Sequence, residues 1–237
     1  MHLEFWVSSI GARPVTKAEV GVATEDGRSY FRITTLLNKI HVPYVDVILG
    51  EPRLPHDEYY SSTSDQLVKS LKLVITTRRE RLLFAGMNIV CVEDLGDDVG
   101  VAKERLFATL YRFKDNDWFV VGIDPGERTG LAAFMNHLEV ESSVFVSLDD
   151  TVSRVSKLID NAPQVKKIVK IGSGVPVLAE KIAKRLNSQY RQELKIQLVD
   201  ERGTSSLNAR AKNRIGTRDQ RAAKLIAFRD GRDYKLT

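Results

Sequence analysis

Runs of apolar residues rich in β-branched side chains recur along the first half of the chain. They predict strands over residues 3–9, 44–50, 71–77 and 88–95. The segments between them have helical spacing and predict helices over residues 28–41, 77–86 and 98–113. Strands that alternate with helices at these lengths are typical of a small, doubly wound parallel α/β domain. The polar segment 114–117 contains no apolar residue, so we expect one domain over residues 1–116 and a second over 117–237.

The second half predicts the element order β-β-β-α-β-α-β-α. Its strands are expected over residues 118–124, 131–135, 138–148, 166–172 and 194–201. The first helix is expected to follow an N-cap at Asp150 or Thr151, and Pro176 is expected to open the second. Two further helical stretches, 205–213 and 218–230, follow N-caps at Thr204 and Thr217. The hairpin between the first strands predicts antiparallel pairing beside parallel strands, so we expect a mixed sheet in this domain. Both halves combine strands with helices, so the expected fold class of the whole chain is α/β.

The composition is typical of a soluble globular protein, with 43% hydrophobic and 28% charged residues in 237. The apolar runs are too short to span a bilayer, and the first residues lack the pattern of a signal peptide. We therefore expect a cytoplasmic protein without a membrane partner. The one cysteine, Cys91, lies in an apolar run, which excludes an intramolecular disulfide and a cysteine-rich zinc site.

Positive charge is concentrated at the end of the chain. The net charge is −2 over residues 1–117, zero over 118–201 and +7 over 202–237. A localised basic segment attracts polyanions, because it concentrates phosphate and releases counterions on binding. A solvated basic helix would give the same count, so charge alone leaves both interpretations open.

Three acids occupy positions where a purely structural sequence would avoid a charge. Asp124 and Glu201 end apolar strands, and Asp219 shares a helical stripe with the apolar residues 222, 223 and 226. We expect the three carboxylates to meet in one crevice at the carboxyl edge of the sheet. They would repel one another unless divalent cations held them, and oxygen ligands favour Mg²⁺ or Mn²⁺. Two such ions are typical of phosphodiester cleavage.

Each acid also has a structural interpretation. Asp124 is in a suitable position to cap its glycine-containing turn, and Glu201 can belong to a surface turn with Asp200. Asp219 lies two residues after Thr217, where an acid favours a helix N-terminus.

Two other segments have two interpretations each. The loop Gly172–Ser173–Gly174 either presents backbone amides to a phosphate or simply joins a strand to a helix. An acidic cluster after the strand 88–95 either binds a cation or caps the next helix; it consists of Glu93, Asp94, Asp97 and Asp98.

Residues 118–230 resemble the RuvC and YqgF branch of the ribonuclease H-like superfamily. The resemblance rests on the element order together with VVGIDPGERTGLA at the first strand, VDERGTSSLNAR after the last and RDQRAAKLIA on the closing helix. Members of this branch are Holliday-junction resolvases and nucleases of ribosomal RNA precursors. RuvC resolvases carry a second acid three positions before the one matched by Asp219; here that position is Gly216, as in YqgF proteins.

The resemblance implies a ribonuclease H-like domain over residues 117–237 that is a metal-dependent endonuclease. Its catalytic acids and ligands for two Mg²⁺ or Mn²⁺ ions would be Asp124, Glu201 and Asp219. The implied substrate is branched DNA, such as a Holliday junction, or structured RNA, and a homodimer is possible for such a nuclease. Basic residues around Glu201 and Asp219 suit the nucleic-acid backbone, namely Arg202, Arg210, Lys212, Arg214, Arg218 and Arg221.

Two alternative functions remain open from the sequence. A nucleic-acid-binding module that has lost catalysis would keep the fold and the basic segment. An actin-like phosphotransferase would need two lobes of this fold to clamp a nucleotide, and the first half of the chain resembles no such lobe.

Overall fold

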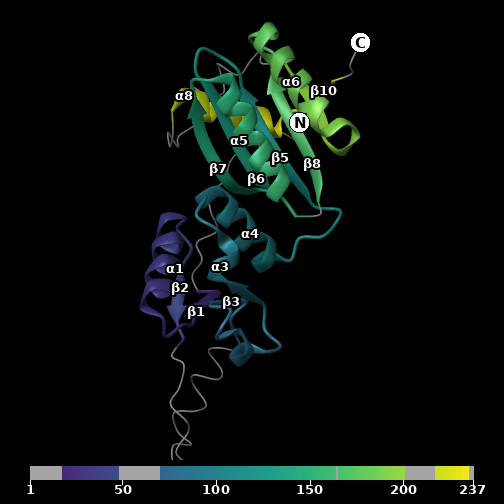
Figure 1. Ribbon diagram of the computed structural model, residues 1–237. Coiled ribbons are helices and arrows are strands. Elements are labelled where there is room, and N and C mark those ends of the chain that lie inside the picture. The colour runs from purple at the N-terminus through teal and green to yellow at the C-terminus, as the bar shows by residue number, and fades with distance from the viewer. Residues whose placement is uncertain (1–17, 48–69, 164, 201–216, 235–237) are drawn as a thin grey trace, which may run out of the picture. The chain divides into compact units, whose positions relative to one another are not determined.

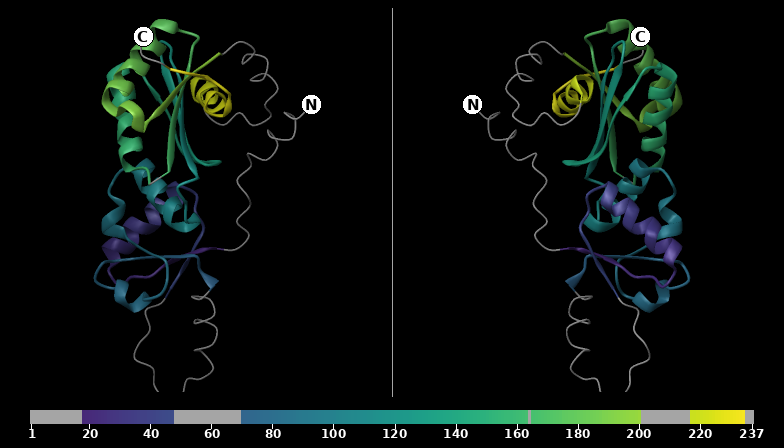
Figure 2. Two further views of the ribbon diagram at one scale, coloured as in Figure 1. Left: turned by 90° about the vertical axis from the view of Figure 1, so that its right-hand side faces the viewer. Right: turned by 90° about the vertical axis from the view of Figure 1, so that its left-hand side faces the viewer.

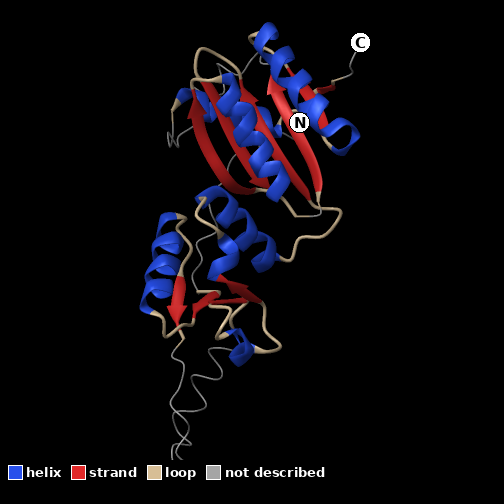
Figure 3. Ribbon diagram, in the orientation of Figure 1, coloured by secondary structure: helices blue, strands red, loops and turns tan. Residues whose placement is uncertain are grey.

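The computed structural model describes residues 18–47, 70–163, 165–200 and 217–234 (Figure 1). The chain divides into two compact units, Met1–Arg112 and Phe113–Thr237. The boundary precedes the expected one because the last helix of unit 1 ends at Tyr111, and Arg112 takes a left-handed conformation with φ 49°. Asp117 folds back on Lys114 in a turn that opens unit 2. Both units combine helices with strands, so the α/β class is confirmed (Figure 3).

Unit 1 contains a four-stranded parallel sheet of order β2-β1-β3-β4. Its strands are β1 (Val20–Val22), β2 (Tyr44–Asp46), β3 (Leu73–Thr76) and β4 (Ile89–Cys91). Its helices are α1 (Gly27–Lys39), α3 (Val92–Leu95) and α4 (Val99–Tyr111), with the 3₁₀ turn η2 (Arg81–Phe84). Ile33 and Leu37 of α1 and Leu106 and Leu110 of α4 join one core cluster with the strands, so α1 and α4 cover the same face of the sheet.

Three predictions for unit 1 change. The strand expected over 88–95 ends at Cys91, because residues 92–95 form the short helix α3 instead. The expected strand 3–9 lies outside the described residues, and β1, with only three residues, was not predicted. The expected helix over 77–86 is wrong, because only the short turn η2 forms there. Glu80 directs its side chain to Thr77 and Glu25, and this contact holds residues 77–80 in a turn.

The acidic cluster of unit 1, Glu93, Asp94, Asp97 and Asp98, forms hydrogen bonds and ion pairs within the fold. Asp98 caps α4 by accepting from the helix backbone at 3.1 Å. Asp97 pairs with Arg32 at 2.9 Å, and Asp94 pairs with Arg78. The carboxylate of Glu93 accepts from the backbone N–H of Arg78. These contacts favour the capping interpretation over a cation site.

Glu80 links the loops that follow the two central strands, β1 and β3. Its Oε1 accepts from the backbone N–H of Glu25 at 2.8 Å, and its Oε2 accepts from the Thr77 hydroxyl at 2.5 Å. Burial opposes ionisation of Glu80, but the hydrogen bonds from Thr77, Glu25 and Thr24 outweigh it and lower the pKa of Glu80 below its usual 4.5. The carboxylate is therefore the form that stabilises the fold.

We expect Glu80→Gln to weaken unit 1 at neutral pH and to flatten its response to acid. Because the pKa of Glu80 is lowered in the folded state, its contribution is complete above the unfolded pKa and is lost as pH falls through the folded pKa. Hydrogen–deuterium exchange of β1 and β3 peptides at about pH 7 and about pH 3 would measure this. The control is Glu25→Gln, which keeps the backbone N–H that Glu80 accepts. Equal acid dependence of Glu80→Gln and the wild type would contradict the prediction.

Unit 2 contains a six-stranded mixed sheet of order β10-β9-β8-β5-β6-β7. Its strands are β5 (Trp118–Asp124), β6 (Thr129–Met135), β7 (Leu138–Phe145), β8 (Lys166–Gly172), β9 (Lys195–Val199) and β10 (Arg232–Asp233). Its helices are α5 (Leu148–Asn161), α6 (Pro176–Tyr190) and α8 (Arg218–Phe228), with the 3₁₀ turn η3 (Arg191–Glu193). Strands β5, β6 and β7 pair antiparallel, whereas β8 and β9 run parallel to β5.

The predicted order of strands and helices in unit 2 is confirmed in the described residues, with two differences in detail. Helix α5 begins at Leu148 after an N-cap at Ser147, so the expected cap at Asp150 or Thr151 is wrong. The short strand β10, antiparallel to β9, was not predicted. Pro176 opens α6 and Thr217 caps α8, as expected. The helix expected over 205–213, with its cap at Thr204, lies outside the described residues.

Helices cover both faces of the sheet of unit 2: α5 and α6 lie on one side and α8 on the other (Figure 2). Phe119, Val121 and Ile123 of β5 pack in the cluster that contains α5 and α6. Val120 belongs to the cluster that contains Ala223 and Ala227 of α8. Successive side chains alternate between faces, so β5 directs residues 120, 122 and 124 toward α8.

No helix in the described ranges is both long enough and apolar enough to cross a membrane.

Candidate functional site

Asp124 ends the central strand β5 on the face covered by α8. Its neighbour across the β5–β6 pair is Gly130. Side chains directly opposite each other in an antiparallel pair share a face, with Cβ atoms about 5 Å apart. Asp124 is half-buried, so the strand holds its carboxylate at the edge of the core rather than in open solvent.

Helix α8 approaches the sheet closely because glycines stand at the two crossing points. A methyl group at Gly130 would lie 2.1 Å from the carbonyl oxygen of Asp219, and one at Gly122 would lie 2.2 Å from that of Ala223. Both distances are far shorter than van der Waals contact. The first turn of α8 therefore rests directly on Gly130, where any side chain would separate helix and sheet.

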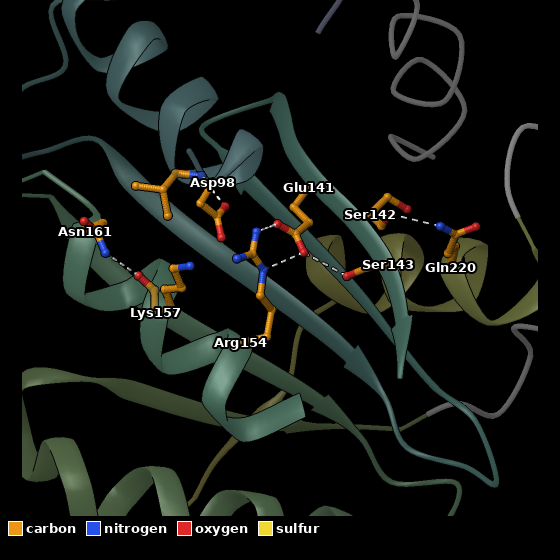
Figure 4. A network of polar contacts seen from close by, with 9 residues as sticks. Asp98, Glu141, Ser142, Ser143, Arg154, Lys157, Asn161 and Gln220 are labelled. Carbon is orange, nitrogen blue, oxygen red and sulfur yellow. Dashed lines mark hydrogen bonds and ion pairs between the residues drawn. The ribbon is translucent and has the colours of Figure 1, made fainter. Parts of the chain in front are cut away.

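Asp219 lies in that first turn, and two hydrogen bonds of its neighbour Gln220 fix the turn in place. The backbone N–H of Thr217 donates to Oε1 of Gln220 at 2.7 Å, completing a capping box with the Thr217 side chain. Nε2 of Gln220 donates to the carbonyl oxygen of Ser142 on β7 at 3.0 Å (Figure 4). Gln220 thus links the first turn of α8 both to its N-cap residue, Thr217, and to strand β7.

Gly130 lies next to the backbones of both Asp124 and Asp219. It is the cross-strand partner of Asp124, and the backbone of Asp219 packs against it. The side chain of Asp219 is 28% exposed and lies 3.7 Å from Nε of Arg128, measured from its Oδ2. Both carboxylates are partly open to solvent, and carboxylate oxygens are ligands of the kind that Mg²⁺ and Mn²⁺ prefer.

The third predicted acid, Glu201, lies outside the described residues. Strand β9 runs parallel to β8 and β5, so its end at Val199 lies at the same edge of the sheet as Asp124. Within the described residues, no group of three acidic, histidine or cysteine side chains is arranged to hold a metal ion. Any complete site therefore needs a ligand from outside the described residues.

Of the six predicted nucleic-acid-binding residues, two lie within the described residues and four lie outside them. Arg218 and Arg221 lie in the first turn of α8, beside Asp219, with Arg218 exposed and Arg221 half-buried. The others lie outside the described residues, namely Arg202, Arg210, Lys212 and Arg214.

Two basic side chains, Lys170 and Arg229, form hydrogen bonds that hold the C-terminal end of α8 against the sheet. Nζ of Lys170, on β8, donates to the carbonyl oxygen of Arg229 at 2.5 Å, and burial lowers the pKa of Lys170. Arg229 in turn donates from its guanidinium to the carbonyl oxygen of Asp200 at 3.1 Å. Asp200 immediately precedes Glu201, so this contact also holds the chain end from which Glu201 continues.

A hollow of about 800 Å³ opens beside the ends of β8 and β9. It is lined by Ser173, Gly174, Leu198, Asp200, Asp230, Gly231 and Arg232. The backbone N–H and the hydroxyl of Ser173 both donate to the carbonyl oxygen of Val199. Because Ser173 is engaged in joining β8 to β9, the loop 172–174 fits the connecting interpretation better than the phosphate-binding one.

Sequence reasoning missed Gly122, Gly130, Gln220 and Arg128. The glycines had a readable signal, because a glycine inside a strand often marks the close approach of another backbone. Gln220 also had one, since Thr217 and Gln220 have the spacing of a capping box. Arg128 gave no signal, because its contact depends on where α8 packs.

Comparison of the sequence with protein-family models and with curated proteins finds no match. Among solved structures, the chain is similar to a crystal structure of Aa-Ago with externally bound siRNA, with a TM-score of 0.26 and 12% sequence identity. The matched region covers 80% of the present chain and 36% of the Aa-Ago chain. The present chain thus spans about a third of the length of that protein, and a score this low supports no inference about fold or function.

Proposed function

We propose that this protein is a divalent-metal-dependent endonuclease that cleaves phosphodiester bonds in branched DNA or structured RNA. The proposal assigns unit 2 to the RuvC and YqgF branch of the ribonuclease H-like superfamily. One observation carries it: Gly130 is paired with Asp124 at the end of β5 and is packed against the backbone of Asp219 in the first turn of α8.

The arrangement of the sheet supports this assignment. The first strand of unit 2, β5, lies inside the sheet, with the antiparallel strands β6 and β7 on one side and the parallel strands β8 and β9 on the other. Two of the three acids that matched the family, Asp124 and Asp219, lie at the end of that inner strand and on the helix that covers it. Three acids at one sheet edge would complete the site, with Glu201 following β9.

In the proposed reaction the carboxylates of Asp124, Asp219 and Glu201 would hold one or two Mg²⁺ or Mn²⁺ ions. When bound, such ions activate water and stabilise the leaving oxygen in phosphodiester cleavage. Strand β5 and helix α8 supply rigid supports for Asp124 and Asp219, and Gln220 keeps the first turn of α8 in register with β7. The basic residues after Glu201 would bind the phosphate backbone and orient the bond to be cut.

The test is the substitution Asp124→Asn, which keeps the shape of the side chain and removes its charge. We expect Mn²⁺ binding to weaken and cleavage of a four-way DNA junction or a structured RNA to fall by at least about 100-fold. Nucleic-acid affinity should change little, because the phosphate contacts come from other residues. Glu127→Gln is the matched control, since Glu127 lies in the same turn and is exposed.

The outcomes separate the proposed enzyme from the alternatives. Cleavage by Asp124→Asn at the wild-type rate would contradict the proposal. Tight binding of junctions or structured RNA, with no cleavage by the wild type in Mg²⁺ or Mn²⁺, would identify a binding module. Saturable binding of ATP would instead favour a phosphotransferase.

A further inference from the structure

Arg128 lies directly before β6, in the turn that connects it to β5, and contacts the candidate site. Its Nε lies 3.7 Å from Oδ2 of Asp219. The side chain of Arg128 is 58% exposed, whereas that of Asp219 is 28% exposed. The pair therefore lies at the rim of the site, where the guanidinium has room to leave the carboxylate.

The position of Arg128 beside β6 explains why this arginine reaches Asp219. Arg128 is followed by Thr129, the first residue of β6, and lies two residues before Gly130. The backbone of Asp219 packs against Gly130, and Asp124 is paired with Gly130 across the strands. Glu127, one residue earlier, is exposed.

A guanidinium and a divalent cation compete for the same carboxylate. Arg128 offsets the negative charge of Asp219 in the metal-free protein, but it would be repelled by a cation held between Asp219 and Asp124. A phosphate oxygen is the anion that the substrate would bring to such a site. The planar fork of arginine matches phosphate geometry with two hydrogen bonds.

We propose that Arg128 exchanges partners: it pairs with Asp219 in the metal-free protein and binds a phosphate of the nucleic acid once the site holds divalent cations. This inference rests on the proposed metal site. It adds a phosphate-binding residue from the β5–β6 turn, apart from the basic segment after Glu201.

The first arm of the test measures Mn²⁺ binding without nucleic acid, from the electron paramagnetic resonance signal of free Mn²⁺. Arg128→Ala removes the competing cation, so we expect Mn²⁺ to bind about two- to fivefold more tightly than to the wild type. Lys224→Ala is the matched loss of charge: Lys224 is on α8, about 8 Å along the helix from Asp219, and pairs with Glu139 at 2.7 Å. We expect it to bind Mn²⁺ as the wild type does.

The second arm measures affinity for a four-way DNA junction and for a structured RNA at several salt concentrations. In EDTA, Arg128→Ala should bind like the wild type, because Arg128 is engaged with Asp219 in that state. In Ca²⁺, which takes oxygen ligands like Mg²⁺, the variant should bind more weakly. Its slope of log affinity against log salt should be shallower by about one unit. Arg128→Lys keeps the charge, so its nucleic-acid affinity in Ca²⁺ should lie between those of Arg128→Ala and the wild type.

The results distinguish this inference from the proposed function. An unchanged Mn²⁺ affinity, or a salt slope in Ca²⁺ equal to that of the wild type, would overturn the exchange of partners while leaving the metal site intact. Absence of Mn²⁺ binding in the wild type and in Arg128→Ala alike would overturn the metal site itself.

Discussion

Gly130→Ala is expected to destabilise unit 2 by about 3 kcal/mol or more, because the added methyl group would lie 2.1 Å from the carbonyl oxygen of Asp219. The obstacle is backbone, which cannot rotate away as a side chain can. The first turn of α8 must therefore move off the sheet. Gly122→Ala should have a similar cost, since its methyl group would meet the backbone of Ala223 at 2.2 Å and that of Ala227 at 2.7 Å.

The measurement is unfolding in urea followed by the fluorescence of Trp118 in a Trp6→Phe background. Trp118 reports on α8 because its ring lies edge-on to Phe228, with centroids 6.2 Å apart. The control is Gly27→Ala at the start of α1, where a methyl group would meet nothing within 4 Å. A loss of stability below about 1 kcal/mol in Gly130→Ala would contradict the close packing of α8 on the sheet.

The same variant links packing to function. Displacement of the first turn of α8 would move Asp219 away from Asp124, so the folded fraction of Gly130→Ala should bind Mn²⁺ more weakly than the wild type. Gly122→Ala disturbs the middle of the helix, where Ala223 packs, and should spare the metal affinity more. The pair of variants thus separates stability from the position of Asp219.

Strands β5 and β6 of unit 2 could be predicted because each follows an apolar run with few charges, as in residues 118–124 and 131–135. Burial on both faces makes such a run recognisable. The start of α8 was equally readable, since Thr217 is a good N-cap. The two acids that the structure describes, Asp124 and Asp219, were predicted from the cost of placing a charge beside apolar neighbours.

Elements that depend on tertiary contacts were not predictable from the local pattern. Strand β10 consists of Arg232 and Asp233, and only its pairing with β9 makes it a strand. At the start of α5, Ser147, Asp150 and Thr151 are all residue types that favour an N-cap. Ser147 takes that position and accepts from the backbone N–H groups of Asp149 and Asp150, which places both acids in the first turn. An acid there favours the positive end of the helix dipole, so the chain uses the earlier cap.

The contact between Asp219 and Arg128 could not be predicted either, because it too depends on tertiary packing. The sequence shows Arg128 only as one charge in a turn, and nothing nearby along the chain indicates a residue 91 positions later. Its role becomes visible once Gly130 brings α8 onto β6. Close backbone contact, rather than local propensity, decides which charged groups meet.

The second large effect is expected at an ion pair on the opposite face of the sheet. Arg154 of α5 donates from Nε to Oε1 of Glu141 on β7 at 2.8 Å, and Nη2 contacts Oε2 (Figure 4). Ser143 adds a hydrogen bond from its hydroxyl to Oε1 at 2.9 Å. The side chains of Arg154 and Glu141 are only 16% and 12% exposed, so each charge depends on the other.

Arg154→Met should therefore destabilise unit 2 by about 3 to 5 kcal/mol, because it leaves the carboxylate of Glu141 in the interior without its cation. The double variant Arg154→Met, Glu141→Leu removes both charges and should recover most of that loss, since an apolar pair of similar volume often replaces a buried ion pair without cost. Urea unfolding of the single and double variants measures the coupling. Helix α5 lies on the face opposite α8, so Mn²⁺ affinity measured without urea should stay at the wild-type value. A double variant less stable than Arg154→Met would show that Glu141 stabilises the fold without its arginine.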